Sequence, residues 1–179
     1  MKLSNLSGQL GKFLDMPDVL PPVESWNPPL SGDIDMRICS NGAWLHEGDE
    51  IKREKLVRLF STILKREDND YFLVTPVEKW RISVEDQPFV VVLMEVINQG
   101  NSNQIIRMIT NTGDEIELNH QNPMITDDHE APKVLIRGNM HARLSRNVFY
   151  QLAEMAFEKD GCFWVLSGGC EFAISNESG

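Results

Sequence analysis

The sequence predicts an α+β fold in which two repeated strand–helix–strand units pack around a mostly antiparallel sheet, behind a proline-rich N-terminal strap. Apolar and charged residues alternate from Ile34 to Ile38, which is the period of a half-buried strand. Apolar residues from Leu56 to Leu64 follow the helical spacing instead. Phe89 to Ile97 is a nearly continuous β-branched run, typical of a central strand buried on both faces for much of its length.

These patterns divide the chain into four predicted segments. They are residues 1–30, a helix and the proline-rich strap; 31–88, the first α+β unit; 89–132, the central strands and a polar loop; and 133–179, the second α+β unit. At 179 residues the chain is long enough to bury a core without disulfides or metals.

The N-terminal segment carries two weak signals. Residues 1–14 hold a sparse apolar stripe that predicts a short helix. Residues 15–30 hold five prolines, so they must run extended and cannot join a central ladder. We expect this strap to be anchored through Val19, Leu20 and Trp26.

The first unit begins with a hairpin and continues into a helix. Asn41-Gly42 favours a tight turn between the strand ending at Ile38 and a return strand over 43–46. The helix is predicted over Arg53 to Glu67, with Lys65 and Arg66 in its last turn, where cations suit the helix dipole.

Strands complete the unit and resume after it. Residues 71–74 and 77–82 are predicted strands, separated by a bend at Thr75-Pro76. Residues 104–110 and 115–118 are predicted to form a hairpin, and 119–132 a polar loop.

A fainter copy of the first unit follows near the C-terminus. Shifting the sequence by 93 positions, as from Ile51 to Leu144, places Leu56 over Phe149 and so aligns the two predicted helices. Two such units could bury their open apolar faces on each other and on the strands between them. Identities are few, so the alternative is chance similarity of two amphipathic helices followed by strands.

Composition excludes several function classes. The formal net charge of −10 and the lack of a dense Lys/Arg cluster argue against binding to nucleic acid. No apolar run is long enough to span a membrane, and the N-terminus lacks a secretory apolar region. The odd number of cysteines, Cys39, Cys162 and Cys170, fits a reducing, cytoplasmic setting.

Four sequence blocks, in this order, resemble a known family. They are Ser31-Gly32-Asp33-Ile34-Asp35-Met36-Arg37-Ile38; Trp44 to Ser61 with His46-Glu47-Gly48, Ile51, Arg53 and Leu56 to Ser61; Leu73 to Lys79; and Val84-Glu85-Asp86 followed by Pro88-Phe89. The chain is similar in these blocks to the bacterial domain of unknown function 1285 family. The resemblance covers Trp26 to the C-terminus and implies a bacterial α+β protein with repeated structural motifs and a part in signal transduction. It implies no catalytic residues.

Polar residues in these blocks gather at strand ends and at the start of the predicted helix. The candidate ligand-binding residues are Asp33, Asp35, His46, Arg53, Glu78, Lys79 and Asp86. A cation at a helix start opposes the helix dipole, so Arg53 needs either a bound anion or an ion pair with an acid such as Asp86 or Glu78.

A second set of roles is open to three of these residues. Asp33 and Asp35 share a strand face, and the hairpin could bring His46 near them to hold a divalent cation or to act as acid and base. A solvated strand face with a cross-strand ion pair is the structural alternative, favoured because no metal-binding motif is present.

We therefore expect a binding or regulatory module rather than an enzyme, with a small-ligand or anion site between the repeat units. The alternatives are a metal-assisted hydrolase using Asp33, Asp35 and His46, and a protein–protein adaptor using the strap or an exposed sheet edge. We expect no cofactor and no resident metal. A small molecule, an anion or a protein remains a candidate partner, and the sequence does not determine the oligomeric state.

Overall fold

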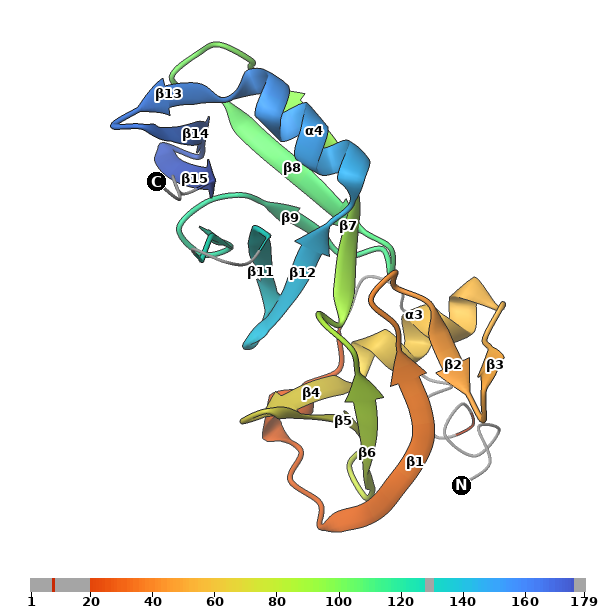
Figure 1. Ribbon diagram of the computed structural model, residues 1–179. Helices are drawn as coiled ribbons and strands as arrows, with labels where there is room; N and C mark the ends of the chain where they lie inside the picture. The colour runs from red at the N-terminus through yellow and green to blue at the C-terminus, as the bar shows by residue number, and fades with distance from the viewer. Residues whose placement is uncertain (1–7, 9–19, 128–130, 176–179) are drawn as a thin grey trace. The chain divides into compact units, whose positions relative to one another are not determined.

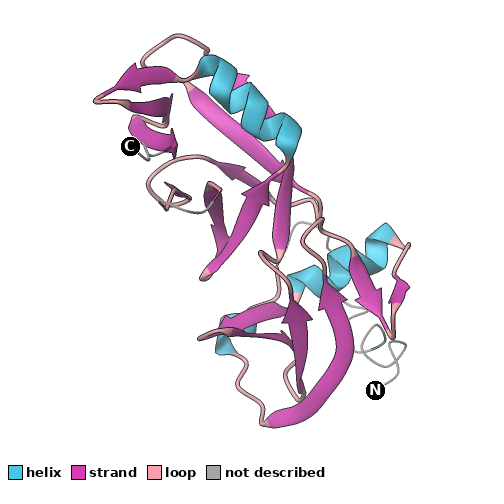
Figure 2. Ribbon diagram, viewed as in Figure 1, coloured by secondary structure: helices cyan, strands magenta, loops and turns pink. Residues whose placement is uncertain are grey.

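The computed structural model describes residues 20–127 and 131–175, together with Gly8. Strands are the main regular structure of the described chain (Figure 1 and Figure 2). The chain divides into two compact units, Met1–Asp86 and Gln87–Gly179. The predicted α+β class is wrong, because the strands form three separate sheets in a mostly β structure and not one sheet between strand–helix–strand units. Of the helix predicted over residues 1–14, only Gly8 is described, and its backbone is helical.

Unit 1 contains one six-stranded sheet and one α-helix among its described residues. Its elements are η1 (Val23–Ser25), β1 (Leu30–Ile38), β2 (Trp44–His46), β3 (Asp49–Glu50), α3 (Glu54–Thr62), β4 (Leu64–Glu67), β5 (Asp70–Val74) and β6 (Lys79–Val84). The strand order is β3-β2-β1-β6-β5-β4, and the pair β1–β6 is parallel while the other pairs are antiparallel.

Alternation along the strands gives this sheet an inner and an outer face. Met36, Ile38, Leu73 and Ile82 are buried on the inner face. Figure 1 shows α3 crossing the ends of β1 and β6, and the buried Phe60 comes from this helix. The predicted hairpin at Asn41-Gly42 is present, since β1 and β2 pair with Ile38 opposite Trp44.

The helix of unit 1 is shorter than predicted. It ends at Thr62, and the backbone of Ile63 is already bonded to β5 through Val74 N–H at 2.9 Å. Lys65 and Arg66 therefore lie in strand β4 and not in a helical turn. Ile63 and Leu64 continue the apolar stripe because the junction itself is buried, which periodicity cannot distinguish from one more turn of helix.

Unit 2 contains the other two sheets. Its elements are β7 (Phe89–Ile97), β8 (Ile105–Thr110), β9 (Glu115–Glu117), β10 (Met124–Ile125), β11 (Lys133–Arg137), β12 (Met140–Leu144), α4 (Arg146–Met155), β13 (Phe157–Lys159), β14 (Cys162–Ser167) and β15 (Cys170–Ser175). A six-stranded sheet has the order β10-β11-β12-β7-β8-β9, with β12 and β7 parallel, and β13-β14-β15 forms a separate antiparallel sheet.

A shared motif lies behind the similarity of the two halves. In each unit a helix is followed at once by three antiparallel strands, β4–β6 after α3 and β13–β15 after α4. The first set joins the large sheet of its unit, whereas the second set stands apart. The two helices start differently, since Ser145 caps α4 by accepting a hydrogen bond from Val148 N–H and Arg53 offers α3 no such bond.

Two further features bear on function. The strap over residues 21–29 runs beside β4, where the ammonium of Lys65 donates a hydrogen bond to the carbonyl of Trp26 at 3.2 Å. Of the other two predicted anchors, Leu20 is exposed and Val19 lies outside the described residues.

Among the described helices, none has the length and apolar character needed to cross a membrane.

Candidate functional site

The outer face of the unit 1 sheet carries a row of functional side chains. Strand register places Lys65 opposite Phe72, Phe72 opposite Arg81, and Arg81 opposite Asp33, so one residue from each of four adjacent strands shares the row. Glu67, Asp70 and Lys79 border this row. We call the set Asp33, Lys65, Glu67, Asp70, Lys79 and Arg81, arranged around Phe72, the charged face.

The ring of Phe72 is the centre of the charged face. It is buried although its side chain lies on the outer side of the sheet. The ammonium of Lys79 lies 5.0 Å from the ring centroid and the guanidinium carbon of Arg81 lies 5.7 Å from it. Both distances are within the range of cation–π attraction, so the ring holds the two cationic side chains in place.

Glu67 forms ion pairs with both lysines of the charged face. Its carboxylate accepts a hydrogen bond from Lys79 Nζ at 2.8 Å and lies 3.5 Å from Lys65 Nζ. The hydrogen bond from Lys79 lowers the pKa of Glu67 below its ordinary value, so the carboxylate stays charged in mild acid. The side chain of Lys65 is only 7% exposed, and its ammonium also meets Trp26 and Asn27 of the strap. Both lysines are therefore fully engaged.

The ion pairs of Arg81 are longer than the bond between Lys79 and Glu67. The Arg81 guanidinium lies 3.5 Å from Asp33 and 3.8 Å from Asp70, both longer than a charge-assisted hydrogen bond of about 2.8 Å. Its Nε, which faces Asp70, is buried and makes no hydrogen bond within the described residues, yet the side chain as a whole is 42% exposed. Arg81 thus presents hydrogen-bond donors to solvent from a side chain fixed on an aromatic ring.

The structure places Asp33 and Lys79 of the predicted site on the charged face, on the neighbouring strands β1 and β6. Asp35 points from the same side of β1, since it is exposed and lies two residues from Asp33. His46 pairs directly with Met36, whose side chain is buried on the inner face. The register therefore puts His46 on the opposite side of the sheet from the two aspartates.

The remaining predicted residues lie at ends of elements. Arg53 precedes α3 with an exposed side chain, and among the described residues neither it nor His46 makes a side-chain hydrogen bond or ion pair. Glu78 closes a turn in which its N–H donates to the Thr75 hydroxyl at 3.0 Å. Asp86 is exposed at the end of unit 1. Within the described residues, no group of three or more His, Cys, Asp or Glu is arranged to hold a metal ion.

Four members of the charged face and its central ring were missed from the sequence. Assigning Lys65 and Glu67 to a helix concealed the β4–β5 hairpin, in which Asp68 takes a left-handed φ of 53° at the turn. Arg81 could have been found, because Lys79, Arg81 and Ser83 alternate with apolar residues at the period of a strand. Phe72 lies in the continuous apolar run from Tyr71 to Val74, so no alternation marks it in the sequence.

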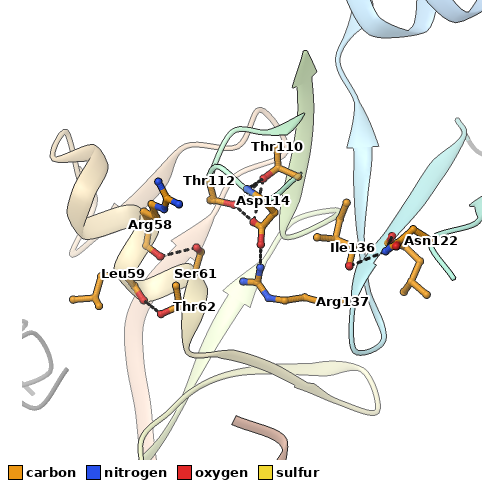
Figure 3. Close-up of polar contacts among 11 residues, drawn as sticks. Arg58, Leu59, Ser61, Thr62, Thr110, Thr112, Asp114, Asn122, Ile136 and Arg137 are labelled. Atoms are coloured by element: carbon orange, nitrogen blue, oxygen red, sulfur yellow. Dashed lines mark hydrogen bonds and ion pairs between the residues drawn. The ribbon is translucent and has the colours of Figure 1, made fainter. Parts of the chain in front are cut away.

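A second polar cluster lies within unit 2 and has a different character. Arg137, at the end of β11, forms an ion pair with Asp114 and lies 4.7 Å from the Phe89 centroid. Figure 3 shows Asp114 also accepting from the hydroxyls of Thr112 at 2.7 Å and Thr110 at 3.1 Å.

Burial decides what this second cluster can do. The Arg137 and Asp114 side chains are only 16% and 13% exposed. Burial lowers the pKa of Arg137 to about 10, which leaves the guanidinium charged at neutral pH. Its partners already satisfy it, so the cluster joins the β8–β9 turn to β11 rather than offering a site.

Comparisons with known proteins place the chain among relatives of unknown function. The family model "Domain of unknown function (DUF1285), N-terminal domain" matches residues 21–87, and "Protein of unknown function (DUF1285), C-terminal domain" matches 88–174. The junction of the two matches adjoins the boundary between the two units after Asp86. No curated protein matches the chain.

Two solved structures are similar over much of the chain. A DUF1285 family protein from Silicibacter pomeroyi DSS-3 is 42% identical, with a TM-score of 0.81 and 88% of each chain covered. A DUF1285 family protein from Shewanella baltica OS155 is 27% identical, with a TM-score of 0.55, 69% of this chain covered and 92% of that one.

Proposed function

We propose, from the premise that the chain belongs to the bacterial DUF1285 family, that it is a binding module whose charged face recognises a carboxylate or phosphate group on a small molecule. The family is one of unknown function, so the proposal rests on the residues of this chain. It retains the expected anion-binding role and assigns it to unit 1.

The main observation that supports the proposal is the position of the Arg81 guanidinium over Phe72, with no close carboxylate partner. An arginine presents its donors in a fixed planar fork that matches the two oxygens of a carboxylate or phosphate. Here the fork lies over Phe72, which limits its rotation, and its two acidic neighbours remain beyond close hydrogen-bond distance. Little ordering entropy is then left to lose when an anion binds.

The rest of the charged face favours a small, polar ligand. Asp33 and Asp70 are mostly exposed, at 73% and 58%, so both carboxylates can turn into solvent and let an anion replace them at Arg81. Lys65 and Lys79 share the single carboxylate of Glu67, so these three side chains together leave a net positive charge beside the site. Ligands that also carry an ammonium group gain from these acids, so amino acids suit this face as well as simple organic acids.

In this proposal the ligand is a signal that is bound and released, not a substrate. A part in signal transduction, which the family resemblance implies, would then follow from ligand-dependent changes around the strap that Lys65 contacts. The three cysteines are free, which supports a reducing, cytoplasmic setting as part of the same proposal.

The first experiment is a thermal-shift screen of the purified full chain against inorganic phosphate, nucleotides, amino acids, organic acids and divalent metals. Any compound that raises the melting temperature is then measured by calorimetry with wild type, Arg81→Gln and Arg66→Gln. Arg66 is a matched control, because it also lies over an aromatic ring, Tyr71 at 5.5 Å, in the same β4–β5 hairpin.

Arg81→Gln should weaken binding about tenfold or more, since hydrogen bonds to charged groups are worth roughly 1.5–3 kcal/mol. Arg66→Gln should leave the affinity within about twofold, because Tyr71 and Arg66 occupy the inner side of the hairpin. If none of these compounds stabilises the protein, or if Arg81→Gln binds as tightly as wild type, the proposal is wrong.

A further inference from the structure

The outer side of β7 and β8 in unit 2 leaves large apolar side chains in solvent. Leu93 is 59% exposed and Val92 is 39% exposed, although both belong to a run that the sequence predicts to be buried on both faces for much of its length. In the structure only Phe89, Val90 and Val91 at the start of β7 are fully buried. A strand whose composition suits burial on two faces is therefore covered on one.

A β-bulge explains which residues are exposed. Val91 pairs with Thr110 and Leu93 with Ile109, so Val92 is the extra residue and has no partner of its own on β8. Beyond the bulge, Leu93, Ile109 and Glu115 form one row across β7, β8 and β9. We call this row, together with Val92 and the next row of Glu95, Arg107 and Glu117, the β7–β9 outer face.

The charges on this face are unequal. Arg107 lies 3.9 Å from Glu95 and 3.6 Å from Glu117, so it is shared between two carboxylates. Glu115 is exposed and adds a third acid beside the apolar row. Across β7, β8 and β9 the three acids outnumber Arg107, so this part of the outer face carries net negative charge, which attracts cationic groups and repels a second copy of the same face.

We propose that the β7–β9 outer face is a docking surface for a basic amphipathic segment of a protein partner, with apolar side chains covering Val92 and Leu93 and Lys or Arg side chains reaching Glu95, Glu115 and Glu117. Exposed apolar surface edged by polar residues is the usual mark of a protein interaction site. The acids supply the selectivity, because they favour a basic partner over acidic or anionic surfaces. This role is independent of the anion site in unit 1.

The test uses the full chain and a short fluorescein-labelled peptide with leucine at alternate positions and lysine between them. Fluorescence anisotropy measures binding to wild type and to three variants. Leu93→Ser and Glu115→Gln alter the docking surface. Val77→Ser is the matched control, because Val77 is 67% exposed but belongs to unit 1.

Leu93→Ser should weaken binding about tenfold, since burying a leucine side chain contributes roughly 1.5–3 kcal/mol. Glu115→Gln should weaken it about threefold at low ionic strength and less at high salt. Val77→Ser should match wild type. A second peptide with serine in place of leucine should bind at least about fivefold more weakly, because it keeps the charge and loses the apolar contact.

Three results would overturn the proposal. The first is equal binding by wild type and Leu93→Ser, which would mean that the peptide attaches elsewhere through charge alone. The second is a wild-type dimer in sedimentation experiments that Leu93→Ser dissociates, which would make a second copy the occupant. The third is binding of wild type to anionic phospholipid vesicles that Leu93→Ser abolishes, which would make the occupant a membrane.

Discussion

The buried ion pair between Arg137 and Asp114 provides a quantitative test of the energetics of unit 2. Replacing Arg137 with Met removes the cation beside the Asp114 carboxylate, which is 13% exposed in the wild-type structure and also accepts hydrogen bonds from Thr110 and Thr112. Breaking a buried pair on one side costs about 3–5 kcal/mol. Because the two hydroxyls still hold part of the carboxylate's charge, we expect the lower end, about 3 kcal/mol.

Urea unfolding of four proteins measures this cost: wild type, Arg137→Met, Asp114→Asn and the double variant. The double variant should be more stable than the sum of the two single losses by at least about 1 kcal/mol, since it leaves no unpaired buried charge. Lys159→Met is the control, because Lys159 pairs with Glu171 in the same unit with both side chains more than two-fifths exposed, and the urea midpoint should not move. A loss below about 1 kcal/mol for Arg137→Met, or strict additivity in the double variant, would refute the reasoning.

Three further outcomes follow from individual positions. In urea unfolding, Gly168→Ala should destabilise the protein by about 1–2 kcal/mol more than Gly169→Ala does. Both glycines have positive φ, but only a Cβ at position 168 would lie 2.9 Å from Asn119 Cβ. Equal losses of stability would contradict this reasoning. Arg53→Ser should raise the free energy of unfolding by about 0.5–1 kcal/mol, because Arg53 occupies the N-cap position of α3 and its side chain accepts no capping hydrogen bond. A loss of stability in this variant would contradict the prediction. Glu67→Gln should reduce the loss of melting temperature in acid. The hydrogen bond from Lys79 lowers the pKa of Glu67 in the folded protein, so the charged carboxylate stabilises wild type above the ordinary pKa of 4.5 and this stabilisation is lost as the pH falls below it. An unchanged dependence of melting temperature on acidic pH in the variant would contradict the role of Lys79.

Local patterns in the sequence predicted many strands but not their assembly. The alternation from Ile34 to Ile38 and the turn at Asn41-Gly42 gave β1 and its hairpin with β2, because both signals depend on neighbouring residues. The parallel pairs β1–β6 and β12–β7 could not be predicted, since each joins strands far apart in the chain. Strands as short as β3 and β10 show too few residues for any period to appear.

For the candidate site too, the sequence identified individual residues but not their contacts. Asp33 and Lys79 were recognised as polar residues beside predicted strands, but their shared neighbour Phe72 follows only from the strand register. Arg137 and Asp114 are 23 residues apart and meet only in the folded unit. Charged residues can thus be identified from sequence, whereas their pairing and burial require the three-dimensional arrangement.

The most direct measurement of the proposed function is the side-chain Nε–H resonance of Arg81, observed by ¹H–¹⁵N NMR of the full chain while inorganic phosphate, citrate or glutamate is added. Arg81 Nε is buried and makes no hydrogen bond to the residues that the structure describes, so an anion bound by the guanidinium should change the chemical shift of its proton. A saturable shift of the Arg81 resonance, with the Arg66 resonance unchanged, is the predicted result. Saturable shifts confined to residues away from Phe72 and Arg81, or none with any of the three anions, would contradict the assignment of an anion site to this face.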